Sequence, residues 1–230
     1  MGDPRHFPAL LPLLASGGVL AFVGRAVLAL PPTASGLAVE MRDGAKASGI
    51  KNVVTAVLLD FRGYDTLLEI AVLMLATVAV LSLREDPAAL SRRIAGRAGP
   101  VLGALTRTLA PLMILVAGHL VWVGSSEPGG AFQGGAVLGA AGILLVLSGY
   151  AQPAWAGQRI VRWVLTVGLL AFIGVALYPM FGGGSLLQYP AESRKGLILF
   201  IEILLTLSIG ASILSLFLAS ASATAGGERP

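Results

Sequence analysis

Charged residues at the start of one apolar segment could carry ion or proton chemistry. Asp60, Arg62, Asp65 and Glu69 lie at the entrance of an apolar run that continues through Leu83. Ionisable side chains beside or inside such a run cost free energy to bury, so they indicate a function. Asp65 and Glu69 are four residues apart, so a helix places them on one face, with Arg62 about one turn earlier. We predict a path for a proton or a small cation here, with Glu69 as its deepest group.

The same charges have a second interpretation. Asp60, Arg62 and Asp65 could lie at the level of the lipid headgroups, where Asp65 and Thr66 supply polarity to the first turn of a helix. This interpretation is favoured for Asp60 and Asp65. A functional role is favoured for Glu69, because it lies deeper in the apolar run.

A glycine-rich stretch, EPGGAFQGG, forms a second group at positions 127 to 135. Pro128 fixes one backbone angle and the glycines allow unusual conformations, so the stretch predicts a tight turn back into the membrane. It is not a phosphate loop, because the lysine and the strand-to-helix context of such loops are missing. Gly135 and Gly139 have the spacing of close helix packing, which we predict to involve a second protein of the same complex. Glu127 is predicted to be a solvated turn residue.

Three further ionisable residues lie within apolar segments: Arg107, His119 and Glu202. His119 could relay protons near neutral pH, although a lone histidine near a helix end more often has a structural role. Glu202 lies seven residues beyond Lys195, on the same helix face but two turns away. An ion path and pairing with another protein chain are equally compatible with Glu202. Helix packing alone explains a polar stripe on the same segment, formed by Ser208, Ser212 and Ser215.

The composition is that of a helical membrane protein: 56% of residues are hydrophobic, 12% are charged and the mean hydropathy is +0.84. The chain has no cysteine and only two histidines, which argues against disulfides, iron–sulfur clusters and a protein-built metal centre. No nucleophile–base pair or cofactor motif occurs, so we expect neither an enzyme nor a cofactor. The net charge of +4 comes mainly from short loops rather than one patch, so nucleic acid is not an expected partner.

About six apolar segments are long enough to cross a bilayer, which takes roughly 20 helical residues. They fall near residues 7–30, 65–83, 101–123, 131–150, 160–179 and 196–219. Residues 53–59 are apolar but too few to cross, and predict a short buried or interfacial helix before Gly63. A hydrophilic linker at 87–99 separates a two-span module, 1–86, from a four-span module, 100–230. The predicted fold class is therefore an all-α, multi-pass membrane protein. The loop charges weakly favour cytoplasmic termini in a plasma or inner membrane.

Both motifs carry a family resemblance. The stretch NVVTAVLLDFRGYDTLLEIAVL resembles the C-terminal region of the large MrpA subunit of Mrp-type multisubunit Na+/H+ antiporters, and the equivalent MbhE subunit of membrane-bound hydrogenases. The stretch EPGGAFQGG, with the four-span module and Glu202 in its last helix, is similar to the MrpB/MnhB subunit. The family's usual PGGGF has Ala131 at its fourth position here. Ser125 stands where a histidine often precedes the motif.

The resemblance implies a fused accessory subunit of an ion-translocating complex, with other Mrp-type subunits, lipid, Na+ and H+ as partners. The acidic motif of the family matches Asp60, Arg62, Asp65 and Glu69, and Na+ binding at Glu69 would be transient. The packing turn of the family matches a second set: Pro128, Gly129, Gly130 and Phe132.

Two alternatives remain open beside this interpretation. The chain could belong to a redox-driven pump such as a membrane-bound hydrogenase, or it could be a purely structural scaffold without an ion path. An independent carrier is disfavoured, because the two halves show no inverted repeat.

Overall fold

The structure is a computed structural model that describes residues 7–29, 43–44, 49–82, 99–151 and 159–226. Every regular element within these ranges is a helix, so the predicted all-α class is confirmed. The chain divides into two units, Met1–Asp43 and Gly44–Pro230, which we describe separately. In the first unit, helix α1 (Phe7–Leu28) coincides with the predicted apolar segment and carries Arg25 in its last turn.

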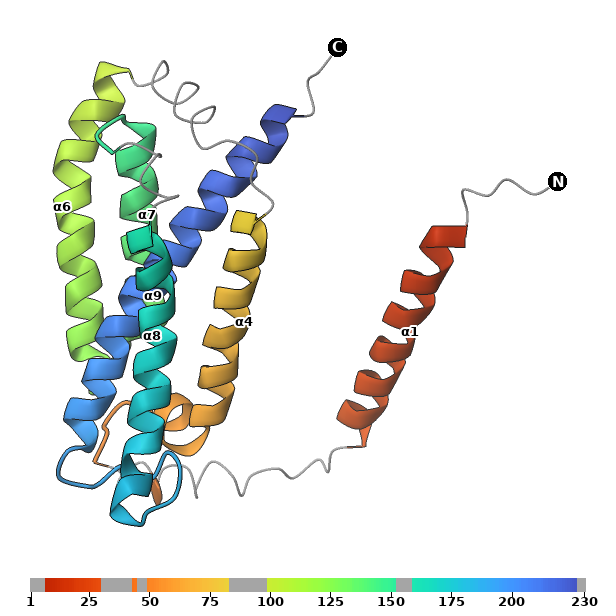
Figure 1. The fold of residues 1–230 in the computed structure, drawn as a ribbon, viewed down its shortest axis with the longest axis vertical. Coiled ribbons are helices and arrows are strands. Elements are labelled where there is room, and N and C mark those ends of the chain that lie inside the picture. The colour runs from red at the N-terminus through yellow and green to blue at the C-terminus, as the bar shows by residue number, and fades with distance from the viewer. Residues whose placement is uncertain (1–6, 30–42, 45–48, 83–98, 152–158, 227–230) are drawn as a thin grey trace. The chain divides into compact units, whose positions relative to one another are not determined.

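Five long helices form a bundle within the described part of the second unit (Figure 1). They are α4 (Gly63–Ser82), α6 (Pro100–Val123), α7 (Ala131–Leu147), α8 (Arg159–Leu177) and α9 (Arg194–Gly226). Among the described residues, four segments are long and apolar enough to cross a membrane, at 63–82, 100–123, 160–182 and 194–220. Helix α7 is apolar but shorter, with 17 residues. Helix length and composition thus make the chain a multi-pass membrane protein.

Helix α9 is the central element of the bundle, and it contacts α4, α6, α7 and α8 (Figure 1). Over its membrane-length window 56% of residues are buried, against 17% for both α4 and α6. Helices α4 and α6 therefore turn most of their apolar surface away from the bundle. That surface needs lipid or other proteins to cover it.

The close approach of α7 to α9 depends on glycines. A Cβ atom placed on Gly135 would lie 2.7 Å from Ile209 Cγ2, and one placed on Gly139 would lie 3.0 Å from Ile213 Cβ. The spacing of the two glycines thus serves close packing, as the sequence predicts. The predicted partner is wrong, however, because the helix that packs on these glycines is α9 of the same chain.

The serine stripe of α9 lies inside the bundle. Ser208, Ser212 and Ser215 are all buried, and the Ser208 hydroxyl donates a 2.7 Å hydrogen bond to the Leu165 carbonyl of α8. Ser212 bonds back to the Ser208 carbonyl of its own helix at 2.9 Å. Packing between helices accounts for these hydroxyl groups, in agreement with the sequence analysis.

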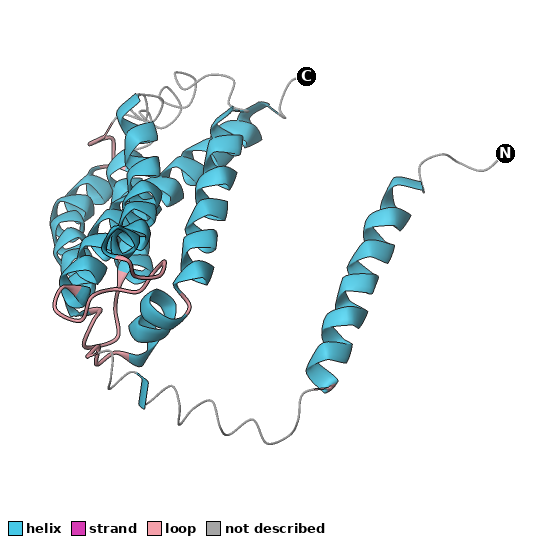
Figure 2. Cartoon of the chain, turned by 60° about the horizontal axis from the view of Figure 1, so that its bottom comes forward, coloured by secondary structure: helices cyan, strands magenta, loops and turns pink. Residues whose placement is uncertain are grey.

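One end of the bundle, which we call the loop end, gathers segments that are far apart in the sequence (Figure 2). These are residues 49–62, the turn at 124–130 and the connection at 178–193. The first contains the short helix α3 (Val53–Thr55) and the π-helix η1 (Ala56–Phe61), where the sequence predicts a short helix. The third begins with the 3-10 helix η3 (Tyr178–Gly182). The predicted linker at 87–99 lies outside the described residues except for Gly99, so the module boundaries stay predictions.

Candidate functional site

A buried carboxylate lies at the loop end of the bundle. Glu202, near the start of α9, is 2% exposed. Its Oε2 atom is buried and has no hydrogen-bond partner among the residues that the structure describes. A buried polar group without a partner costs free energy, and an unpaired charge costs more. Such a group marks a place where a proton, a cation or water can bind.

The glycine-rich turn between α6 and α7 lies directly against this carboxylate. A Cβ atom placed on Gly130 would lie 2.9 Å from Glu202 Oε1, and one placed on Gly124 would lie 3.0 Å from the same atom. Gly130 also has a φ of +114°, which L side chains rarely adopt. A Cβ atom on Gly124 would also lie 2.8 Å from the Gly130 Cα atom, so the two glycines let the turn fold closely against the carboxylate.

The predicted turn residues differ in their exposure and in the atoms that they contact. Pro128 is exposed at its tip, beside the exposed Glu127, whereas Gly130 is buried. A Cβ atom on Gly129 would collide with the Leu120 carbonyl. Phe132 packs from the first turn of α7 against the main hydrophobic core. The turn thus has an exposed outer surface and a closely packed inner surface.

Residues before α4 hold the turn from the outside. The Asn52 side-chain amide donates to the Gly124 carbonyl at 2.8 Å and to the Glu127 carbonyl at 2.7 Å. The Asn52 backbone N–H donates to the Ser125 carbonyl at 3.1 Å. The Thr55 hydroxyl adds a 2.5 Å hydrogen bond to the Gly124 carbonyl. The Asn52–Thr55 segment therefore fastens the turn that covers Glu202.

Sequence reasoning missed Asn52 and Thr55. A signal was present, because an asparagine directly before an apolar run is typical of a helix N-cap. Asn52 does cap α3 through its Oδ1 atom. The cap alone gives no hint that the amide nitrogen bonds to carbonyls far along the chain.

Asp60 lies at the same end of the bundle. Its Oδ1 atom is 3.7 Å from Nε of Arg194, the first residue of α9, and Arg194 Nη2 donates to the Tyr189 carbonyl at 3.2 Å. Burial raises the pKa of the Asp60 carboxyl group, and the nearby Arg194 guanidinium partly offsets that rise. Burial, with a smaller contribution from the Asp60 charge, also raises the pKa of the Tyr189 hydroxyl.

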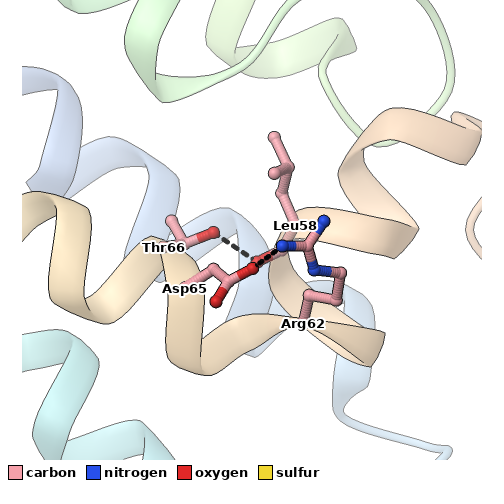
Figure 3. Close-up of polar contacts among 4 residues, drawn as sticks. All are labelled: Leu58, Arg62, Asp65 and Thr66. Atoms are coloured by element: carbon pink, nitrogen blue, oxygen red, sulfur yellow. Dashed lines mark hydrogen bonds and ion pairs between the residues drawn. The ribbon is translucent and has the colours of Figure 1, made fainter. Parts of the chain in front are cut away.

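Arg62 and Asp65 form an ion pair at the start of α4 (Figure 3). Their side chains are 66% and 50% exposed, so water or a neighbouring protein can reach both. Beside them, the Thr66 hydroxyl donates a 2.5 Å hydrogen bond to the Leu58 carbonyl of η1 (Figure 3). This bond ties the short π-helix to α4.

The remaining predicted residues lie on outward faces of their helices. Glu69 on α4 and His119 on α6 are both exposed, whereas Glu202 is buried. Arg107 on α6 donates through Nε to the Tyr150 hydroxyl at 2.6 Å, and its guanidinium lies 5.7 Å from the centre of the Tyr150 ring. The described residues contain no cluster of three or more His, Asp or Glu side chains that could hold a metal.

Comparison with family models shows which protein family the chain belongs to. Residues 101–221, more than half of the chain, match the family model described as a domain related to the MnhB subunit of Na+/H+ antiporter. The chain belongs to this MnhB-related family. Residues 5–95 match a second family model, MbhE, described as the E subunit of MBH, and we call them the MbhE-matched region. The MnhB-related chain therefore combines two matched regions, and both resemblances carried by its sequence motifs are confirmed.

Two curated proteins are similar to this MnhB-related chain. An uncharacterized protein of Methanocaldococcus jannaschii is 30% identical over 153 residues, which are 59% of the chain and 58% of that protein. A probable A/B subunit of a K(+)/H(+) antiporter, from Rhizobium meliloti, is 28% identical over 216 residues, which are 82% of the chain and 21% of that protein. The chain spans less than two thirds of the length of either relative.

Two solved structures share the fold of the MnhB-related chain. The Mrp complex from Dietzia has a TM-score of 0.62 at 22% identity, and the match covers 100% of this chain and 27% of that chain. The membrane-bound sulfane sulfur reductase, an archaeal respiratory membrane complex, has a TM-score of 0.66 at 19% identity. That match covers 93% of this chain and 98% of the other.

The Glu202 site joins the two matched regions of the MnhB-related chain. Asn52 and Thr55 belong to the MbhE-matched region, whereas the turn and Glu202 belong to the MnhB-related region. Hydrogen bonds from the first region to Gly124 thus fasten a turn of the second. Residues of both regions therefore build the site.

Proposed function

We propose that this chain is an accessory membrane subunit of a multisubunit cation/proton antiporter, and that it helps to form the ion path and the contacts between subunits. The observation that carries the proposal is the buried, unpartnered Glu202 carboxylate within the MnhB-related region. The antiporter named among its relatives and the fold shared with the Mrp complex support it. Its partners would be the other subunits of such a complex.

In this proposal Glu202 is the ion-binding group inside the chain. A charge on its carboxylate has no hydrogen-bond partner at Oε2 among the described residues, so a proton or a hard cation such as Na+ is needed to neutralise it. Asp60 lies at the same loop end, with 11% of its side chain exposed. It would attract cations toward the bundle, with Arg194 limiting how strongly it holds them.

The charged face of α4 would complete the path together with a neighbouring subunit. Arg62, Asp65 and Glu69 are exposed on a helix that is otherwise apolar and outward-facing. A charge in lipid is costly, so a protein or a water-filled channel should cover this face. Glu69 would then bind Na+ transiently, and His119 would relay protons on the exposed side of α6. No catalytic step belongs to this chain.

We further propose that six helices cross the membrane. Helix α1 and the short α7 would join α4, α6, α8 and α9, in a two-span module at 1–86 and a four-span module at 100–230. The membrane would be the plasma or inner membrane, with cytoplasmic termini. The weak excess of loop arginines on the side of the termini supports this orientation.

Paired carboxylate substitutions test the proposed path. Glu202→Gln and Glu69→Gln keep the size of each side chain but remove its charge. Glu127→Gln makes the same change on the exposed surface of the turn and serves as the control. Cation-dependent proton movement is measured in inverted vesicles that contain the whole complex, and assembly is followed on a native gel. Loss of transport with intact assembly in the first two variants supports an ion path. Loss of assembly instead supports a scaffold, and unchanged transport in Glu202→Gln contradicts a role for this site.

A component of a redox-driven pump, such as a membrane-bound hydrogenase, is the second candidate. The match of residues 5–95 to the MbhE family model and the fold shared with the sulfane sulfur reductase favour it. Purification of the tagged chain from native membranes separates the two candidates. Antiporter-like subunits alone support the exchanger, whereas iron–sulfur or hydrogenase subunits support the pump.

A further inference from the structure

We propose that Asn52 and Thr55 are positioning residues that keep the 124–130 turn closed over Glu202 and so control the access of water and ions to its carboxylate. The contacts of these residues alone support the closure. Its consequence for transport rests on the function proposed above.

The Gly124 carbonyl is the point through which the Asn52–Thr55 segment acts. It accepts hydrogen bonds from both the Asn52 amide and the Thr55 hydroxyl, at 2.8 and 2.5 Å. The same glycine lies against Glu202 on its other side, since its Cβ position is 3.0 Å from Oε1. A shift of the Asn52–Thr55 segment would therefore move the backbone that touches the carboxylate.

The turn also has hydrogen bonds of its own to α6. The backbone N–H groups of Ser126 and Glu127 both donate to the Val123 carbonyl at 2.8 Å, and the Gly130 N–H donates to the Leu120 carbonyl at 2.8 Å. The Ser126 hydroxyl also donates to the Val123 carbonyl, at 3.1 Å. These bonds tie the middle and the end of the turn to α6 through N–H and hydroxyl groups. The Glu127 carbonyl, near the middle, accepts from the Asn52 amide at 2.7 Å.

The turn lies between an exposed surface and the buried acid. Glu127 and Pro128 are exposed on its outer surface, while Gly124, Gly130 and Glu202 are buried beneath. Loss of the bonds from Asn52 and Thr55 would free the Gly124 and Glu127 carbonyls, while the N–H groups of Ser126, Glu127 and Gly130 stay bonded to α6. A shift of the turn at these carbonyls would connect its exposed surface with the carboxylate.

Asn52 has two functions that can be separated by experiment. Its Oδ1 atom caps α3 by accepting from the Val54 N–H at 3.0 Å, and its Nδ2 atom bonds to the turn. Asn52→Asp keeps the capping oxygen and the size of the side chain but removes the amide donor. Thr55→Val removes the second donor at nearly constant shape. Thr106→Val is a matched control, because the buried Thr106 hydroxyl bonds within its own helix, to the Leu102 carbonyl.

The sequence contains no cysteine, so labelling of an introduced thiol reports on one site once this chain is separated from the other subunits on a denaturing gel. We would place Glu202→Cys in the full chain, within its native complex and membrane, and measure how fast a small polar maleimide labels it. Slow labelling is expected with the turn closed. Asn52→Asp and Thr55→Val should each speed labelling by about tenfold, the factor that corresponds to losing one or two net hydrogen bonds. Thr106→Val should leave the rate unchanged.

Three results would overturn the proposal: fast labelling in the parent, no labelling in any variant, or equal rates in the Asn52, Thr55 and Thr106 variants. If Asn52→Asp does not accumulate, Thr55→Val alone decides. The labelling rate does not depend on transport, so the two proposals fail separately. Faster labelling in Asn52→Asp and Thr55→Val, together with normal transport in Glu202→Gln, would support the closed turn and contradict the ion-binding role of Glu202. Unchanged labelling in those two variants, together with lost transport in Glu202→Gln, would support the ion-binding role and contradict the closed turn.

Discussion

Asp60 and Arg194 join the segment before α4 to the first residue of α9, with 3.7 Å between Oδ1 and Nε. The pair links a residue of the MbhE-matched region to a residue of the MnhB-related region. It is a second link between the regions at the loop end, beside the hydrogen bonds of Asn52 and Thr55. Both links are polar and local, so each can be tested by one side-chain change.

The pKa of Asp60 sets the direction of a pH effect. Burial raises this pKa above its usual value despite Arg194, so the folded chain disfavours the ionised carboxylate. The stability contributed by the protonated group is present at low pH and is lost as pH rises through the folded pKa. We expect Asp60→Asn to flatten the fall in melting temperature between acidic and neutral pH. A parallel curve for the parent and the variant would contradict this.

Gly130→Ala should destabilise the chain by about 1–3 kcal/mol, the usual cost of a non-glycine residue in a strained backbone conformation. The φ of +114° and the 2.9 Å separation from Glu202 Oε1 both oppose a Cβ atom. Thermal unfolding of the purified complex measures the effect. Gly174→Ala on α8 is the control, because a Cβ there meets nothing within 4 Å. An equal melting temperature for the two variants would show that the turn tolerates side chains.

Gly135→Ala should loosen the contact between α7 and α9. The added Cβ would lie 2.7 Å from Ile209 Cγ2, and overpacking of this kind typically costs about 1–3 kcal/mol. We expect lower yield of the folded chain and faster proteolysis near α7. Gly118→Ala on α6 provides the comparison, because a Cβ atom there meets nothing within 4 Å. Wild-type yield for Gly135→Ala would mean that α7 can shift without cost.

The exposed pair of Arg62 and Asp65 should matter little to this chain alone. Exposed ion pairs contribute about 0–1 kcal/mol, so Asp65→Asn should hardly change thermal unfolding of the isolated chain. If a neighbouring subunit covers this face of α4, the same variant should reduce recovery of the complex. Recovery equal to that of the parent would place the contacts between subunits elsewhere.

The helices were predictable because an apolar segment that crosses the membrane must be long enough to span its hydrocarbon core. The predicted segments at 65–83 and 101–123 differ from α4 and α6 by no more than two residues at their ends. Hydrogen bonds between distant side chains leave no such periodic trace. Asn52 and Gly124 are 72 positions apart, and nothing in either local sequence indicates the other.

The candidate site was predicted in part. Its acid, Glu202, was recognisable as a charge within an apolar segment, and the glycine turn by its composition. Their contact could not be predicted, because it depends on how α6, α7 and α9 pack. The choice of Glu69 as the deepest group followed from its position along the chain. The structure shows Glu69 on an exposed face, since depth in a segment does not determine which side of a helix faces inward.

The central position of α9 has a consequence for biosynthesis. Helix α9 follows the other helices in the sequence, yet α4, α6, α7 and α8 all pack on it. While the ribosome is still making the chain, the glycine face of α7 and the Leu165 carbonyl of α8 have no α9 to meet. Until α9 is made, the earlier helices therefore lack the element on which all four of them pack, although α6 already contacts α7. A chain that stops before α9 would lack this central contact permanently.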